Sequence, residues 1–147
     1  MLKPFVAVGP FRFGSTWQAI AKEHGVPDSF ELDDIMHERR EHRFGVVLHY
    51  RGPFGTGRYV NRLRSVLIPR GAHVVFNGID IMHDREAVRE LSAYDTPAHT
   101  ENPYMIFPKL GLYLGGFGKA KIKERKLGYA VAQDALKEFE ELAADPS

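Results

Sequence analysis

The sequence has no cysteine, no long apolar run and almost no net charge, and each absence excludes a class of protein. Without cysteine the chain forms no disulfide bond and no cysteine-ligated zinc site, which fits a reducing compartment. No apolar run approaches the roughly 18 residues that span a membrane, and the apolar stretch 5–8 is too short for a signal peptide. With a net charge of +1, any electrostatic preference has to come from local clusters. We therefore expect a cytoplasmic protein that does not enter a membrane.

The composition is that of an ordinary folded domain. The chain has 147 residues, of which 44% are hydrophobic and 27% are charged. These values lie close to the averages of globular proteins, and a chain of this length buries enough surface to fold without a disulfide or a metal. We expect residues 1–147 to form a single domain.

The clearest local pattern predicts a helix near the N-terminus. Ser15 is followed three residues later by Gln18, the spacing of a capping box in which each side chain bonds the other residue's backbone. Gly25 has the place of a left-handed residue after a helix, and Pro27 blocks any continuation. The pattern therefore predicts a helix from Thr16 to His24.

Residues 44–69 predict a β-hairpin. Two strands, Gly45 to Arg51 and Arg58 to Ile68, flank a glycine- and proline-rich loop over residues 52–57. Pairing Arg51 with Arg58 gives both strands a consistent alternation. The apolar face then carries Val46, Leu48, Tyr50, Tyr59, Leu63 and Leu67. The opposite, basic face carries Val47, His49, Arg51, Arg58, Val60, Arg62 and Arg64.

The second half of the chain repeats this organisation loosely. Asp84 has the place of a cap for a short helix with an apolar side at Ala87, Val88 and Leu91. Pro108-Lys109 suits the centre of a tight turn between two strands. Pairing across this turn predicts one apolar face, made of Met105, Phe107, Leu110, Leu112 and Leu114.

The remaining segments complete the predicted fold. Residues 127–131 favour a last strand, residues 133–143 favour a C-terminal helix, and the charged residues 28–43 favour a short helix or an ordered loop. Long crossovers between parallel strands are missing, which favours antiparallel pairing. We therefore predict an α+β fold, an antiparallel sheet with helices packed on one face, in which a helix-plus-hairpin unit occurs twice.

Motifs that suggest chemistry fail on spacing or context. His37 and His42 are five residues apart, which on a helix separates them by about 140° and prevents them from sharing a metal ion. Residues 52–57 have the glycine spacing of a phosphate loop, but the required lysine and hydroxyl residue do not follow. The only local histidine–aspartate group is His83 with its neighbour Asp84, beside Asp80. We expect no catalytic residue, no metal site and no cofactor.

The basic face of the hairpin is the sharpest surface feature. Arginine outnumbers lysine there, and its planar guanidinium suits carboxylates and phosphates. This face is either an ordinary solvated sheet surface or a docking surface for an acidic protein or a phosphate backbone. Aromatic residues of the same hairpin supply interface anchors. The candidate partner-binding residues are His49, Arg51, Phe54, Arg58, Tyr59, Arg62 and Arg64.

Three short stretches carry a resemblance to known proteins. Residues 9–16 resemble the opener Gly-Pro-Phe-x-Phe-Gly-Met-Thr/Ser, with Ser15 at the place of the methionine. Residues 106–114 resemble a later Phe-Pro-x-Leu-Gly-Leu-x-Leu hairpin, and residues 76–80 resemble the segment before a second helix. In all three stretches the chain resembles small bacterial proteins that are similar to the immunity type, which are encoded near polymorphic toxins. The helix-plus-strands repeat resembles that of β-lactamase-inhibitor-like domains.

Three functions follow as expectations. The resemblance implies a cytoplasmic immunity-type protein that neutralises a cognate toxin by covering its active or binding surface, without catalysis. The first alternative is a small-ligand-binding or enzymatic domain, with a polar lining made of His73, Asp80, His83 and Asp84. The second alternative is nucleic-acid binding through the basic face and the lysine-rich segment 119–126.

Overall fold

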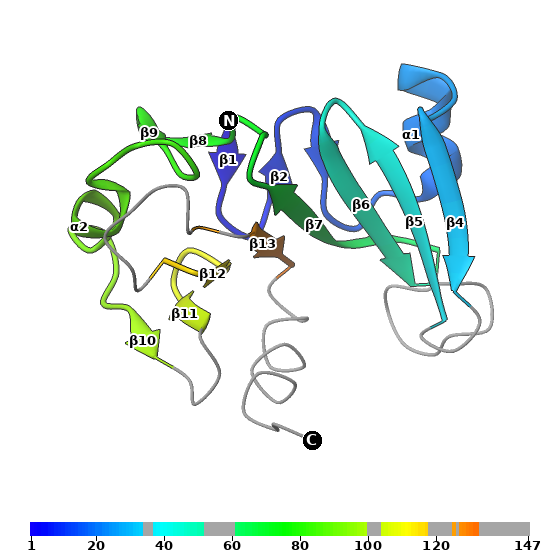
Figure 1. The fold of residues 1–147 in the computed structure, drawn as a ribbon. Coiled ribbons are helices and arrows are strands. Elements are labelled where there is room, and N and C mark those ends of the chain that lie inside the picture. The colour runs from blue at the N-terminus through cyan, green and yellow to red at the C-terminus, as the bar shows by residue number, and fades with distance from the viewer. Residues whose placement is uncertain (34–36, 52–60, 100–103, 118–124, 126, 133–147) are drawn as a thin grey trace.

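The fold is dominated by one antiparallel sheet of eight strands in the order β10-β11-β12-β13-β7-β6-β5-β4 (Figure 1). The computed structural model describes residues 1–33, 37–51, 61–99, 104–117, 125 and 127–132. The strands of this sheet are β4 (Ser29–Asp33), β5 (Glu38–Arg43), β6 (Val46–Arg51), β7 (Leu63–Pro69), β10 (Ala98–His99), β11 (Tyr104–Phe107), β12 (Leu112–Gly115) and β13 (Leu127–Val131).

Two small sheets and two helices complete the described elements. β1 (Leu2–Lys3), β2 (Ala7–Val8) and β3 (Phe11–Arg12) form one sheet, and β8 (Val75–Phe76) pairs with β9 (Ile79–Asp80) in the other. The helices are α1 (Trp17–His24) and α2 (Ala87–Leu91), of eight and five residues. The predicted α+β fold with helices packed on one face of a sheet is therefore wrong, because the described chain is mostly β-strand.

The charged residues 28–43 account for much of this error. They were predicted to form a short helix or an ordered loop, but they contain β4 and β5, which pair antiparallel. On one face of this strand pair, ion pairs join the two strands: Arg40 lies 3.0 Å from Asp33 and His42 lies 3.2 Å from Glu31. Opposite charges across a strand pair stabilise it, so these strands form without the apolar alternation that sequence reasoning looks for.

Helix α1 begins and ends where the sequence indicated, although a different residue caps it. Thr16, rather than Ser15, is the N-cap residue, and its hydroxyl oxygen accepts a hydrogen bond from the backbone N–H of Ala19 at 3.1 Å. Gly25 follows the helix with a φ of 76°, a conformation that glycine adopts without steric cost. The predicted capping box at Ser15 is wrong, and the predicted end of the helix is confirmed. The C-terminal helix predicted over 133–143 lies outside the described residues.

Strands β6 and β7 form the predicted hairpin with a different register. We predicted that Arg51 pairs with Arg58, whereas Val47 pairs with Leu67, with a bulge near the end of β6. The two registers differ by an odd number of residues, which exchanges the faces of most of β7. Leu67 therefore lies on the face predicted to be basic, and Val66 occupies the core position instead.

Strands β11 and β12 also form the predicted hairpin, and here the predicted faces are confirmed. Phe107 pairs with Leu112 and Met105 pairs with Leu114. This register differs from pairing centred on Pro108-Lys109 by two residues, which leaves every side chain on its own face. All five predicted apolar residues of this hairpin belong to the main core cluster.

The core runs continuously across the sheet and includes parts of both small sheets and both helices. Each helix precedes a four-stranded antiparallel meander, β4–β7 after α1 and β10–β13 after α2, and the two meanders join where β7 pairs with β13. The predicted strand over 127–131 is confirmed as β13. No helix in the described part of the chain is long and apolar enough to cross a membrane.

Candidate functional site

Of the predicted partner-binding residues, the four that the structure describes do not lie together on one water-facing surface. Phe54, Arg58 and Tyr59 lie outside the described residues. Arg51 is half-buried at the end of β6. Arg62 is exposed just before β7, and its guanidinium donates a hydrogen bond to the carbonyl oxygen of Gly14 at 2.8 Å.

The two remaining predicted residues, Arg64 and His49, are buried beside Glu38. Nη2 of Arg64 lies 3.0 Å from one carboxylate oxygen of Glu38, and Nδ1 of His49 lies 3.4 Å from the other. Burial raises the pKa of Glu38, but His49, Arg64 and Arg40 outweigh it and lower the pKa. The predicted exposure of Arg64 and His49 is wrong because an acidic residue of β5 faces both. Their part in partner binding stays a prediction.

The opposite face of β5 holds a second buried carboxylate, Glu41. It is completely buried and accepts hydrogen bonds from Nε of Arg39 at 3.0 Å, Nε of Arg43 at 3.1 Å and the hydroxyl of Tyr50 at 3.0 Å. Burial and the neighbouring Glu41 raise the pKa of Tyr50, so its hydroxyl stays protonated and donates a hydrogen bond to the carboxylate. Glu41 therefore fixes three side chains of the strands at this end of the sheet.

Strand β4, at the end of the strand order, exposes apolar side chains. Phe30 is 55% exposed and Leu32 is 58% exposed, and Val26, just before the strand, is also exposed. We call these three residues the β4 edge surface. Phe30 pairs with Glu41 and Leu32 pairs with Arg39, so both point to the face of the sheet on which α1 lies. Apolar side chains on an edge strand are unusual because they invite pairing with another chain.

An open hollow of about 440 Å³ lies beside the β4 edge surface. Its lining residues come from α1, the following turn, β4 and β5: Trp17, Ala21, Val26, Pro27, Asp28, Ser29, Phe30, Arg39 and Glu41. The guanidinium of Arg39 lies 4.1 Å from the ring centre of Trp17 and 4.3 Å from that of Phe30. Stacking on two rings and the bond to Glu41 hold Arg39 in one position. The hollow is therefore shaped before a partner binds, and most of its lining is apolar.

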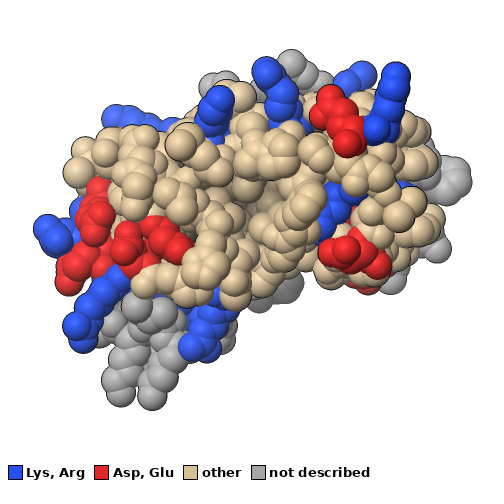
Figure 2. Space-filling view, turned by 90° about the horizontal axis from the view of Figure 1, so that it is seen from above, with Lys and Arg blue, Asp and Glu red and all other residues tan. Residues whose placement is uncertain are grey.

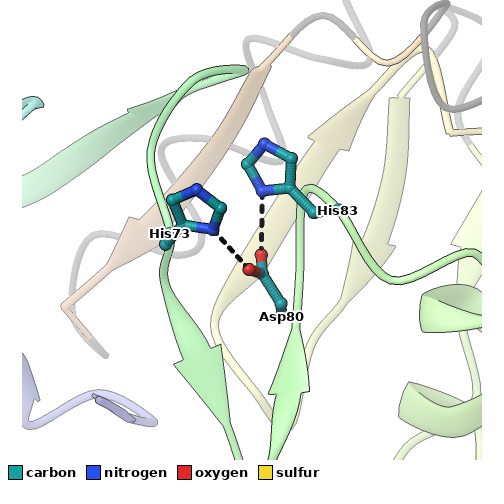
Figure 3. A group of neighbouring side chains, drawn as sticks. All are labelled: His73, Asp80 and His83. Atoms are coloured by element: carbon teal, nitrogen blue, oxygen red, sulfur yellow. Dashed lines mark hydrogen bonds and ion pairs between the residues drawn. The ribbon is translucent and has the colours of Figure 1, made fainter.

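A second group of polar side chains gathers around the β8–β9 hairpin (Figure 3). One carboxylate oxygen of Asp80 lies 2.6 Å from Nδ1 of His73, and the other lies 3.1 Å from Nδ1 of His83. The two imidazole rings stack with their centres 4.1 Å apart. Burial raises the pKa of Asp80, but the hydrogen bonds from both histidines outweigh it and lower the pKa. Sequence reasoning named these residues as a polar lining for the alternative ligand-binding function, without placing His73 beside Asp80. The signal that could have joined them is the Asn77-Gly78 turn, which pairs the strands on either side of it.

Asp84, the fourth residue predicted for that lining, holds the backbone of Asp80 and does not contact the histidine rings in any hydrogen bond that the described residues make. Its side chain accepts a hydrogen bond from the backbone N–H of Asp80 at 3.1 Å. The N-cap position of α2 belongs to Glu86, so the predicted capping role of Asp84 is wrong.

The basic residues that the structure describes give little support to a nucleic-acid surface. Within the segment 119–126, the structure describes only Arg125, which is buried and donates hydrogen bonds to the carbonyl oxygens of Asp84 at 2.6 Å and Arg85 at 3.2 Å. On the face shown in Figure 2, the basic side chains of the described residues stand apart from one another around the rim, with other residues between them, and form no continuous basic patch. Nucleic-acid binding generally relies on such a patch or stripe.

Comparison with known proteins gives no match: no family model, no curated protein and no solved structure is similar to this chain.

Proposed function

We propose that this protein binds another protein and blocks it, with the β4 edge surface and the neighbouring hollow as the docking site. The observation that carries the proposal is the edge strand itself, which exposes Phe30 and Leu32 and has no strand beyond it in the sheet order of the described chain. The charged residues of β4, Glu31 and Asp33, lie on the opposite face of the strand, where they pair with residues of β5, and they leave the apolar face uncovered. An extended segment of a partner can add a strand there, bound through its backbone.

The hollow supplies the specificity of this interaction. A partner strand beside β4 presents every second side chain to the face that carries Phe30 and Leu32. A large apolar side chain at one of these positions enters the hollow beside Trp17 and Arg39. Tryptophan and arginine dominate binding energy at protein interfaces when they line well-packed pockets. Because Glu41 already holds Arg39, binding costs little further ordering of this side chain.

The resemblance to immunity-type proteins suggests what the partner is. We propose that it is a toxin made by the same cell and that this protein covers its active or binding surface in the cytoplasm. Occlusion requires a stable interface and no catalytic group on the inhibitor. The proposed docking surface differs from the basic face first considered, because Arg64 and His49 of that face are buried against Glu38.

The decisive experiment combines co-expression with a charged substitution on the edge. The product of the adjacent gene is expressed with the wild-type chain, with Leu32→Lys, and with Val6→Lys as a control. Val6 is 44% exposed and lies in the turn between β1 and β2, outside the docking surface. We expect wild type and Val6→Lys to restore growth and to form a complex on gel filtration. We expect Leu32→Lys to weaken the complex at least tenfold.

Two outcomes contradict the proposal at different levels. If no complex forms with the wild-type chain and the adjacent gene product stays lethal, the immunity function is wrong. If the complex forms and Leu32→Lys binds as well as Val6→Lys, protein binding stands and the β4 edge surface is not the docking site. Circular dichroism of all three chains shows whether the fold is retained.

A further inference from the structure

We propose that His73, Asp80 and His83 form a binding site for one zinc ion, held by two imidazoles and one carboxylate. The ligand atoms of the three side chains lie within 4.8 Å of one another. They come from three places that the fold brings together: the residue before Val74, the end of β9 and the loop before α2 (Figure 3). Sequence analysis expected no metal site, and the proposal does not depend on the function of the β4 edge surface.

The chemistry of the three side chains selects the class of metal ion. Imidazole suits zinc, copper, nickel and iron, whereas magnesium and calcium take six or more oxygen ligands. Three protein ligands of this kind leave a coordination position open for water. A zinc ion bound at about 2.0–2.2 Å has neighbouring ligand atoms roughly 3.3–3.6 Å apart in tetrahedral geometry. The oxygens of Asp80 already lie 2.6 Å and 3.1 Å from the histidine nitrogens, so small side-chain rotations admit the ion.

The backbone that carries the three side chains is held in place. In the β8–β9 hairpin, Asn77 and Gly78 form a two-residue turn with φ values of 47° and 80°. The turn favours asparagine followed by glycine because both residues need a positive φ. The backbone N–H of Ile81 extends the hairpin by donating to the carbonyl oxygen of Val74 at 3.0 Å. This hairpin fixes the distance between His73 and Asp80.

The loop that carries His83 is fixed from two sides. The backbone N–H groups of His83 and Asp84 both donate to the carbonyl oxygen of Asp80, at 3.2 Å and 2.8 Å. From the interior, the buried guanidinium of Arg125 donates to the carbonyl oxygens of Asp84 and Arg85. A ligand set held in place before the ion arrives loses little conformational entropy on binding.

The exposure of the group leaves it accessible to an ion from solution. The His73 side chain is 70% exposed, that of His83 is 33% exposed and that of Asp80 is 25% exposed. Nδ1 of each ring is the ligand atom of the proposed site, because it faces the Asp80 carboxylate, while the second nitrogen points away from it (Figure 3). The two stacked imidazoles and the carboxylate beside them can therefore be reached by an ion from solution.

The test is isothermal titration of the tag-free, metal-stripped protein with zinc chloride. His73→Asn and His83→Asn are compared with His42→Asn as the matched control. His42 is also an exposed histidine beside a carboxylate, at 3.2 Å from Glu31, but no second histidine completes a three-ligand group there among the described residues. We expect wild type and His42→Asn to bind one zinc ion per chain, and each of the other two variants to bind at least tenfold more weakly.

Cobalt supplies an independent spectroscopic readout on the same proteins. Cobalt bound by two imidazoles and a carboxylate gives visible absorption bands that free aqueous cobalt lacks at comparable intensity, and we expect them in wild type and in His42→Asn only. The proposal is overturned if the wild-type chain binds no zinc, or if His73→Asn and His83→Asn bind it as tightly as His42→Asn. Since His73 is largely exposed, His73→Asn keeps the fold, and its result stands even if His83→Asn unfolds.

Discussion

Two carboxylates in this molecule, Glu41 and Asp80, differ in their burial and in the side chains that donate hydrogen bonds to them. Glu41 lies inside the sheet, is completely buried, and receives its hydrogen bonds from two arginines and a tyrosine. Asp80 lies at the end of the small β8–β9 sheet, is partly exposed, and receives its hydrogen bonds from two histidines. Arginine keeps its charge at every physiological pH, whereas histidine exchanges protons and metal ions readily.

This difference separates a carboxylate with a structural role from one that is free to take part in binding a metal ion. The two arginines bonded to Glu41 keep their charge, and Glu41 orients one of them, Arg39, in the hollow beside the β4 edge surface. The partners of Asp80 have lone pairs that a metal ion can use, on rings that solvent reaches. Whether a buried or exposed carboxylate has a binding role therefore depends on the chemistry of its partners as well as on its burial.

The largest effect is expected at the buried carboxylate. Glu41→Ala leaves the guanidinium of Arg43 buried without its carboxylate and also removes the acceptor of Tyr50. Breaking a buried ion pair by removing one partner costs about 3–5 kcal/mol. We expect a loss of this size in the free energy of unfolding, measured by urea denaturation.

The matched control is Glu31→Ala, on the neighbouring strand. The Glu31 side chain is 56% exposed and pairs with a histidine that is 43% exposed. Exposed ion pairs contribute about 0–1 kcal/mol, so we expect a loss below about 1 kcal/mol. Equal losses for the two variants would show that burial does not distinguish the two sites.

An intermediate effect is expected at Glu38, and it depends on pH. His49, Arg64 and Arg40 overcome the desolvation that raises the pKa of Glu38 and lower it below its value of 4.5 in an unfolded chain. The ionised carboxylate therefore stabilises the folded state above about pH 4.5, and this stabilisation is lost as the pH falls through the lower pKa of the folded state.

Glu38→Gln tests this dependence directly. We expect the variant to be about 1–3 kcal/mol less stable than wild type at pH 7, since a buried hydrogen-bonded charge is removed. The difference between the two proteins should shrink as the pH falls below about 4.5. Urea denaturation at a series of pH values measures this difference. A difference that stays constant from pH 7 to pH 3 would contradict the lowered pKa of Glu38.

The two hairpins explain how far the sequence could predict the fold. In both, strands and turns were recognisable from alternation and from glycine or proline. Pairing around Pro108-Lys109 was displaced by two residues, an even number that keeps Phe107 and Leu112 in the core. Pairing of Arg51 with Arg58 was displaced by an odd number, which exchanged the faces of most of β7. Loop length decides the parity of the register, and a long loop leaves it open.

The candidate sites show a different limit of sequence reasoning. Strands β4 and β5 were missed because their charges pair across the strands, so the apolar alternation typical of strands is weak there. Without β4, no edge strand could be predicted, and the exposed Phe30 and Leu32 had no significance. Sequence reasoning noticed His83 as a chain neighbour of Asp80 and listed His73 only as part of a polar lining. The stacking of the two rings depends on the turn at Asn77-Gly78 and on the loop that Arg125 holds.

The smallest effect on stability is expected at the group around Asp80, and it directly tests the contrast between Asp80 and Glu41. His73→Asn removes one of the two hydrogen bonds to Asp80 at a side chain that is 70% exposed. Exposed pairs of this kind contribute less than about 1 kcal/mol, so we expect the free energy of unfolding at pH 7 to fall by no more than that in metal-free buffer. The same urea titration used for Glu41→Ala measures it. A loss above about 2 kcal/mol would mean that the histidines brace the β8–β9 hairpin as the arginines brace Glu41, and Asp80 would then be a structural carboxylate as well.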